Sequence, residues 1–305
     1  MQISVAVGEV RGLATWEEIS AQARAAADAG FMTAWTSQAL GWDALTTLAA
    51  VGGALDIAVG TAVVPTPQRH PMTLAAQALT VQAAVAGRLT LGVGAGIGAM
   101  VTGMLGLPAD RRVARMREYL TVLGPLLRGE SVDHHGETLT AVGAVQIPGG
   151  VPAPPVLVAA MGPQMVRLAG ELAEGTATWM TGPRVLDAHI VPAITAAAAG
   201  AGRPAPRIVA GLPVCHTDAE DDVRTRIAER FALATQVPEY RATLDREGAT
   251  GPGDIAIVGT AARIRRALTR LGDAGVTEFM AVPFGTSTEQ DRTVELLAEL
   301  AGGIR

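Results

Sequence analysis

The sequence predicts an α/β protein that folds as a closed (β/α)8 barrel, the TIM-barrel architecture. Short apolar runs alternate with amphipathic segments along the 305 residues, which gives eight strand–helix pairs. Glycine, proline and polar residues gather after the predicted strands, where parallel α/β folds bind ligands. An open doubly wound sheet is the alternative. The regular count of eight and the lack of a strong linker favour the barrel.

Each predicted strand is a short apolar run bounded by glycine, proline or polar residues. The third run, for example, follows Asp56 and ends at a turn that contains three prolines, Pro65, Pro67 and Pro71. The predicted strands cover residues 2–7, 32–36, 57–64, 89–93, 155–160, 176–180, 208–215 and 278–282.

The predicted helices follow these strands and show apolar residues at helical spacing. In the first helix, Trp16, Ile19 and Ala23 recur on one face, and Gly30 ends the helix. The third helix begins at Pro71, because the first turn is where proline costs least. The other predicted helices cover residues 42–51, 111–127, 164–173, 185–199, 261–274 and 289–301.

We expect residues 1–305 to form a single domain that carries two insertions, near 131–147 and 219–247. The first insertion has the pattern of a hairpin with a turn at Gly136, and the second has the pattern of additional helices. Barrels of this length often form one domain.

The composition excludes several kinds of chemistry. All 24 basic residues are arginine, so a lysine Schiff base, a lysine general base and a phosphate-loop lysine are ruled out. The single cysteine, Cys215, excludes an intramolecular disulfide and a multi-cysteine metal site. The net charge of −5 argues against a nucleic-acid surface.

The apolar pattern predicts neither a secretory signal nor a membrane span. The first residues lack a basic start and a long apolar stretch. The apolar segment 44–64 is interrupted by Gly52, Gly53 and Asp56, which favours a helix followed by a strand. We therefore expect a cytoplasmic protein that binds neither membranes nor nucleic acid.

Two glycine-containing turns are candidate ligand sites. At 159–164, a strand ends, Gly162 allows close approach, and Pro163 stands where a helix begins. Exposed amides at a helix start suit an anion, above all a phosphate, although an ordinary βα turn has the same pattern. The cluster at 92–96 is a weaker signal, since glycines also simply turn the chain.

Few polar or aromatic side chains follow the predicted strands, and each one alone is more often structural than catalytic. In a barrel they would line one mouth together. They are Glu9, Gln38, Trp42, Arg69, His70, Trp179, Cys215 and His216.

The segment 133–137, with its two adjacent histidines, raises the question of a metal site. Adjacent residues of a strand point to opposite faces, so His134 and His135 would not readily share an ion. A solvated hairpin is the favoured interpretation, and no metal site is predicted. The nucleophile-elbow pattern G-x-S-x-G does not occur.

Several segments in combination resemble the bacterial luciferase-like family over nearly the whole chain. They are TAVVPTPQRHP (61–71), GRLTLGVGAGIG (87–98), MREYLTVLGPLLRGESVDHHGE (116–137), VLVAAMGPQMVRLAGELAEGTATWM (156–180) and IVGTAARIRRALTRLGDAGVTEF (257–279). Within the family, SQALGWDALTTLA (37–49) resembles the branch that uses the deazaflavin coenzyme F420 rather than FMN.

The resemblance implies a homodimeric barrel with a cofactor across its carboxyl mouth. It also implies a non-proline cis peptide between Ala62 and Val63, where a bulge supports the deazaflavin ring. The cofactor-binding residues that it implies are Gln38, Ala62, Val63, Val64, Gly94, Ala95, Met161, Gly162, Pro163 and Gln164, the last four around the phosphate.

The sequence departs from the sugar-phosphate dehydrogenases of that branch. They carry an aspartate–histidine pair after the second strand and a glutamate after the fourth, where this chain has Gln38, Ala39 and Ile97. The lysines that hold a substrate phosphate are also missing, so oxidation of glucose 6-phosphate is not expected.

We therefore predict an F420-dependent oxidoreductase that transfers a hydride between the reduced coenzyme and a C=C or C=N bond of a small organic substrate. Glu9, His216 or a bound water would deliver the proton, and Trp42 and Trp179 would form apolar walls. The alternatives are an FMN-dependent monooxygenase that uses reduced flavin and oxygen, and a non-catalytic cofactor-binding barrel.

Overall fold

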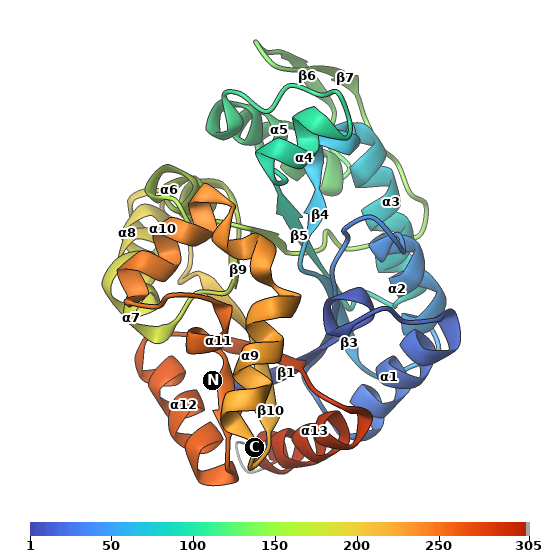
Figure 1. The fold of residues 1–305 in the computed structure, drawn as a ribbon. Coiled ribbons are helices and arrows are strands. Elements are labelled where there is room, and N and C mark those ends of the chain that lie inside the picture. Colours follow the sequence, from blue (N-terminus) through green and yellow to red (C-terminus); the bar gives the residue numbers. More distant parts are fainter. Residues whose placement is uncertain (303–305) are drawn as a thin grey trace.

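The computed structural model describes residues 1–302, and within them eight parallel strands close into a barrel surrounded by helices (Figure 1). The first and last strands of the barrel pair with each other, which closes the ring. The barrel strands are β1 (Gln2–Val7), β2 (Thr33–Thr36), β3 (Ala58–Thr61), β5 (Leu89–Gly94), β8 (Val156–Val158), β9 (Gly175–Trp179), β10 (Arg207–His216) and β12 (Glu278–Pro283). The predicted barrel is therefore confirmed, and the open sheet is excluded.

The third predicted strand differs from the observed one. The prediction of one continuous strand over 57–64 is wrong, because the chain leaves the sheet after β3 and pairs with β5 again only at β4 (Val64–Pro65). The interruption is at Ala62 and Val63, and the peptide bond between these two residues is cis. An apolar run gives no signal for such a bulge.

Most of the helices lie where the apolar spacing predicts them. They are α1 (Trp16–Asp28), α2 (Ala44–Gly52), α3 (Pro71–Ala84), α5 (Arg112–Leu127), α6 (Pro163–Leu172), α8 (Val191–Gly200), α12 (Ala261–Asp273) and α13 (Ser287–Gly302). Helix α2 begins two residues later than predicted, because the Asp43 side chain accepts a hydrogen bond from the amide of Thr46 and caps the helix there. No helix within residues 1–302 is long and apolar enough to cross a membrane.

The shorter elements lie mainly in the connections. The 131–147 segment contains the hairpin β6–β7, and the 219–247 segment contains α9, η4 and α10. Several elements of three to six residues have no clear apolar period, and the sequence did not predict them. The remaining elements are η1 (Glu9–Arg11), η2 (Thr66–Gln68), α4 (Gly98–Gly103), β6 (Val132–His135), β7 (Thr140–Gly143), α7 (Pro183–Val185), η3 (Leu186–Ile190), α9 (Glu220–Arg230), η4 (Ala232–Thr235), α10 (Pro238–Glu247), α11 (Pro252–Ile255) and β11 (Ile257–Gly259).

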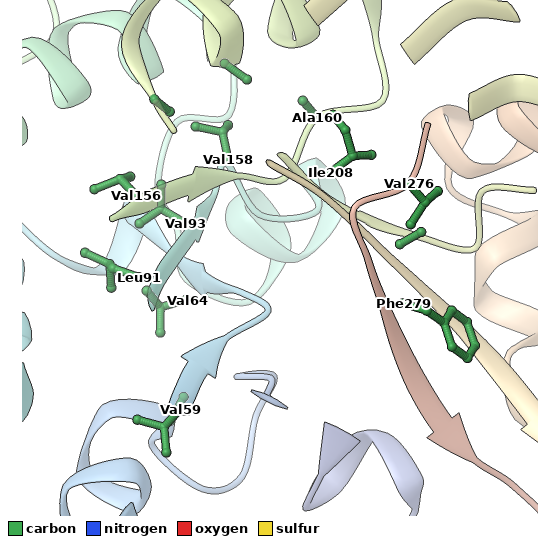
Figure 2. Close-up of a cluster of buried hydrophobic side chains, with 14 of the residues drawn as sticks. Val59, Val64, Leu91, Val93, Val156, Val158, Ala160, Ile208, Val276 and Phe279 are labelled. Carbon is green, nitrogen blue, oxygen red and sulfur yellow. The ribbon is translucent and has the colours of Figure 1, made fainter. Parts of the chain in front are cut away.

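The main core lies between the barrel strands and the helices. Figure 2 shows part of it, where Val64, Leu91, Val93, Val156 and Val158 come from the neighbouring strands β4, β5 and β8. Burying a valine or leucine side chain contributes about 1.5–3 kcal/mol. This layer therefore fixes which side chains of each strand face outward, and the alternate ones must face into the barrel.

The lower interior of the barrel contains a buried polar network centred on Glu278, whose side chain is 1% exposed. Ser4 Oγ and Trp35 Nε1 donate to Glu278 Oε1 at 2.5 and 2.9 Å. Arg207 Nη2 donates to Oε2 at 2.8 Å, and Arg207 Nη1 donates to Thr90 Oγ1 at 3.1 Å. These contacts join β1, β2, β5, β10 and β12 across the barrel.

Replacing Arg207 by methionine should strongly destabilise the protein. The change removes the cation that contacts the buried Glu278 carboxyl group, and breaking such a pair from one side lowers the free energy of unfolding by about 3 kcal/mol. Urea unfolding measures the loss. The matched control is Arg128→Met, whose exposed pair with Glu130 should contribute below about 1 kcal/mol. Equal losses in the two variants would contradict the prediction.

The hairpin is held to α5 by one carboxylate. Glu118 Oε2 accepts hydrogen bonds from Thr138 N and Oγ1 and from Leu139 N, and Oε1 accepts from Glu137 N, all at 2.8–3.1 Å. Burial by itself would raise the pKa of Glu118. The hydrogen bonds outweigh that effect and lower the pKa to about 2.

This lowered pKa predicts acid sensitivity of the hairpin. The stabilisation is present above the pKa of an unfolded glutamate, about 4.3, and is lost as the pH falls towards 2. Amide hydrogen exchange at Thr138 and Leu139 should therefore accelerate, relative to the rest of the chain, between pH 5 and pH 3. Glu118→Gln should remove this pH dependence, while the exposed Glu295→Gln should retain it.

Candidate active site

Large side chains fill the middle of the barrel, below the carboxyl ends of the strands. Trp35 is fully buried and packs with Leu157, Val209 and Met280 from three other strands. Gly60 makes room for the indole, because a Cβ there would lie 2.3 Å from the ring. The interior is therefore closed at this level, and any ligand must bind above it.

Small residues occupy the next level, which faces the opening at the carboxyl ends of the strands, here called the mouth. Gly94 ends β5, and a Cβ on it would lie 2.7 Å from Val63 Cγ2 and 3.4 Å from Ala159 Cβ. On β10, a Cβ on Gly211 would lie 2.3 Å from Met280 Cε and 3.0 Å from the Trp179 ring. These glycines therefore let the side chains of Val63, Met280 and Trp179 pack against the strand backbone at this level.

The bulge between β3 and β4 forms one side of this floor. Ala62 and Val63 are half-buried and pack against the interior cluster. Backbone bonds hold the bulge to the chain after β2, since Ala62 N donates to Thr36 O and Gln38 N donates to Val63 O. Val64 is different: its side chain is fully buried in the helix-facing core, so only its backbone remains for a ligand.

Three aromatic rings form the opposite wall. Trp179 at the end of β9 packs edge-on against Phe231, with ring centroids 5.5 Å apart. Phe231 lies between α9 and η4 and also packs against Phe284, at 6.2 Å, just after β12. The chain has only ten Phe, Trp and Tyr residues, and three of them lie half-buried in this one cluster at the mouth. The sequence indicated Trp179 but gave no signal for the two phenylalanines, which come from distant segments.

Gln38 belongs to a polar cluster beside the bulge. Its Oε1 accepts from Arg69 Nη2 at 3.0 Å, and Arg69 also pairs with Asp43 and donates from Nε to Gln77 Oε1. Burial would raise the pKa of Asp43, but hydrogen bonds from Thr46 and Arg69 lower it. Arg69 therefore fixes the carbonyl oxygen of Gln38, which leaves the Gln38 amide group to donate.

Glu9 and Trp42 lie together at the rim. Glu9 Oε1 accepts from the backbone amide of Trp42 at 2.7 Å, and the side chain covers Gly41. The Trp42 ring packs against Trp16, with centroids 5.9 Å apart, and its Nε1 donates to Ala14 O. Trp42 is thus 41% exposed on the outer rim, separate from the ring cluster of Trp179.

His216 ends β10, next to the short strand β11. The backbone amide of His216 donates to Thr293 Oγ1 of α13. In the sheet, His216 pairs with Gly259 of β11. The neighbouring Cys215 is fully buried, and burial raises the pKa of its thiol to about 12. Cys215 is therefore a neutral thiol near pH 7 and no candidate nucleophile.

The residues at the start of α6 lie under the helical insertion. Gly162 is the N-cap of α6 and makes no side-chain cap bond, Pro163 takes the first helical position, and Gln164 is exposed. The hydroxyl of Thr243 in α10 lies 4.0 Å from the sulfur of Met161. The uncapped amides at this helix start suit an anionic group.

The insertion is fixed across the mouth at two further points. Glu239 of α10 forms an ion pair with Arg112 of α5, and Arg230 at the end of α9 donates to the carbonyl oxygen of Glu9. The helices α9 and α10 (orange in Figure 1) thus connect the β1 side of the mouth with the β5 side. The sequence pattern predicts additional helices in this segment but none of these contacts.

This arrangement fits a flat, largely apolar ring with an anionic tail. The Val63 side chain packs over Gly94, and Gln38, whose amide group is left to donate, lies beside this bulge, so an apolar surface and a donor adjoin here. Among the described residues, no group of three or more His, Cys, Asp and Glu side chains could hold a metal ion.

Comparisons with known proteins agree with this description. The chain is 37% identical over 98 residues to the F420-dependent glucose-6-phosphate dehydrogenase of Mycobacterium leprae, an alignment that covers 31% of this chain and 28% of that protein. It is 29% identical over 175 residues to a Mycobacterium tuberculosis protein named provisionally as a coenzyme F420-dependent oxidoreductase, covering 53% and 50%. The chain thus spans half the length, or less, of these curated relatives.

The likeness to solved structures extends over the whole fold. An F420-dependent secondary alcohol dehydrogenase in complex with an F420–acetone adduct superimposes with a TM-score of 0.81, at 18% identity, over 100% of this chain and 99% of the other. The sequence profile of the luciferase-like monooxygenases matches residues 2–301. This match over nearly the whole chain shows that the protein belongs to the luciferase-like monooxygenase family.

Proposed function

We propose that the protein is an F420-dependent oxidoreductase that reduces a C=C or C=N bond of a small organic substrate. The observation that carries the proposal is the bulge at Ala62 and Val63, which packs against Gly94 at the carboxyl ends of the strands. The F420 named in both curated relatives supports the choice of cofactor. When bound, reduced F420 supplies the hydride.

The residues of the mouth have distinct roles in this proposal. Ala62, Val63 and Gly94 support the ring face, and the Gln38 amide donates to the ring edge. The free amides at the start of α6, beside Gly162, hold the phosphate of the tail. The insertion excludes water from the ring, since Arg230 and Glu239 anchor it on both sides.

The walls favour an apolar substrate. Trp179, Phe231 and Phe284 offer ring faces and edges but no carboxylate, and the chain has no lysine to hold a sugar phosphate. We therefore do not extend the sugar-phosphate specificity named for the Mycobacterium leprae relative to this protein.

Titration with F420 and with FMN tests the cofactor. Saturable quenching of F420 fluorescence with no comparable binding of FMN is expected. Gly94→Ala should weaken F420 binding about tenfold, because the added Cβ displaces Val63 into the ring space. The matched control is Gly103→Ala, whose Cβ meets no atom within 4 Å. Binding of FMN alone would favour the oxygen-using alternative, and binding of neither would reject a cofactor-dependent enzyme.

Turnover of a Glu9→Gln variant tests the proton donor. The glutamine retains an acceptor for the amide of Trp42, so the rim loop should stay in place. If Glu9 delivers the proton, kcat should fall about 10²- to 10⁴-fold while F420 affinity stays unchanged. Full turnover would show that Glu9 is not the proton donor. Turnover of a His216→Gln variant would then distinguish His216 from a bound water as the donor.

A further inference from the structure

A cavity lies between the N-terminal ends of α3 and α5 and the turn of the hairpin. Its volume is about 290 Å³, which is enough for a small organic molecule. The segment from Thr66 to Pro71, the start of α5 and the hairpin residues Thr138 and Leu139 enclose it. Of the residues discussed above, Arg69, Ala95 and Arg112 also line this cavity.

The polar side of the cavity is cationic. Arg69, Arg112 and Arg115 line it, and no aspartate or glutamate is among the lining residues. The carboxylates that pair with these arginines lie outside the lining, so a molecule inside would meet the guanidinium groups and not their partners. This distribution of charge favours an anion.

Arg69 has an unsatisfied hydrogen-bonding group. Its side chain is only 10% exposed, and its Nε and Nη2 atoms bind Gln77, Gln38 and Asp43. Nη1 is buried and has no hydrogen-bond partner. A buried donor of a charged group without a partner is costly, and an anion nearby would reduce that cost.

The backbone adds to the same preference. Helix α5 has 16 residues, its N-cap is Arg111, and no side chain caps its first turn. The start of α3 borders the same cavity. The His70 side chain caps the start of α3, so of these two helices only α5 begins at the cavity without a side-chain cap, at the positive end of its dipole.

The other side of the cavity is apolar. Pro67, Pro108, Met116 and Leu139 line it, together with Ala95, which follows β5 at the edge of the mouth. A bare inorganic ion would leave this surface unused. We infer that the cavity is a second binding site, which takes a phosphate or carboxylate group attached to a small apolar body.

Binding of two probes tests this inference independently of the cofactor. Phosphate and phenyl phosphate are titrated by calorimetry, with sodium chloride at equal ionic strength as the reference. We expect saturable binding of both, about tenfold tighter for phenyl phosphate because its ring covers the apolar lining. No saturable binding of either probe would overturn the inference.

Two variants on one helix locate the site. Arg115→Met should weaken phenyl phosphate binding about tenfold, because Arg115 lines the cavity and its side chain is exposed enough to be replaced without disturbing the core. Arg117→Met is the matched control, since Arg117 is on the same helix but pairs with Glu171 and does not line the cavity. Equal effects of the two substitutions would contradict the inference.

A competition experiment with F420 tests whether the anionic group belongs to the cofactor. Of the experiments on this cavity, only this one rests on the proposed function. If the site holds the acidic tail of F420, complete F420 should compete with phenyl phosphate and the ring system without phosphate and tail should not. If neither competes, a separate metabolite occupies the site. If F420 does not bind at all, the proposed function is wrong. The titrations with phosphate and phenyl phosphate would still test the cavity as an anion site.

Discussion

The fixed width of an eight-stranded barrel is the constraint on which the remaining structure depends. Inward-facing side chains of all strands share one interior, so a large residue at one level requires small ones beside it. Trp35 fills the middle level, and Gly60 makes room for it. The buried Glu278 network closes the level below: the carboxyl group joins four strands, and Arg207 extends the network to Thr90 on a fifth. A ligand can therefore enter only from the mouth.

The mouth is completed by segments that are far apart in the chain. The bulge at Ala62 and Val63 forms one side, while Trp179, Phe231 and Phe284 form the other. The insertion connects the two sides through ion pairs and hydrogen bonds at its ends. The outer cavity adjoins this region, since Ala95 and Arg112 border the mouth on one side and line the cavity on the other. Arg69 likewise binds Gln38 at the mouth and lines the cavity.

The strands and main helices were predictable because they depend on local patterns. Runs such as Gln2–Val7 and Leu89–Gly94 are almost entirely apolar and lie within a residue of their predicted bounds. The interruption of the third strand was not visible as a pattern, and neither were α4, α11 and β11, which are too short for an apolar period. Resemblance to a family, rather than periodicity, indicated the position of the cis bond at Ala62–Val63.

The sequence by itself determined the barrel, its strand order along the chain, and the absence of lysine and disulfide chemistry, because these depend on composition and on neighbours within a few turns. Only the tertiary structure decided which side chains meet. It buried Val64 away from the mouth, engaged Glu9 with the Trp42 amide, and brought Phe231 and Phe284 to Trp179. Contacts between residues 30 or more positions apart depend on how the barrel closes, and no local pattern records that closure.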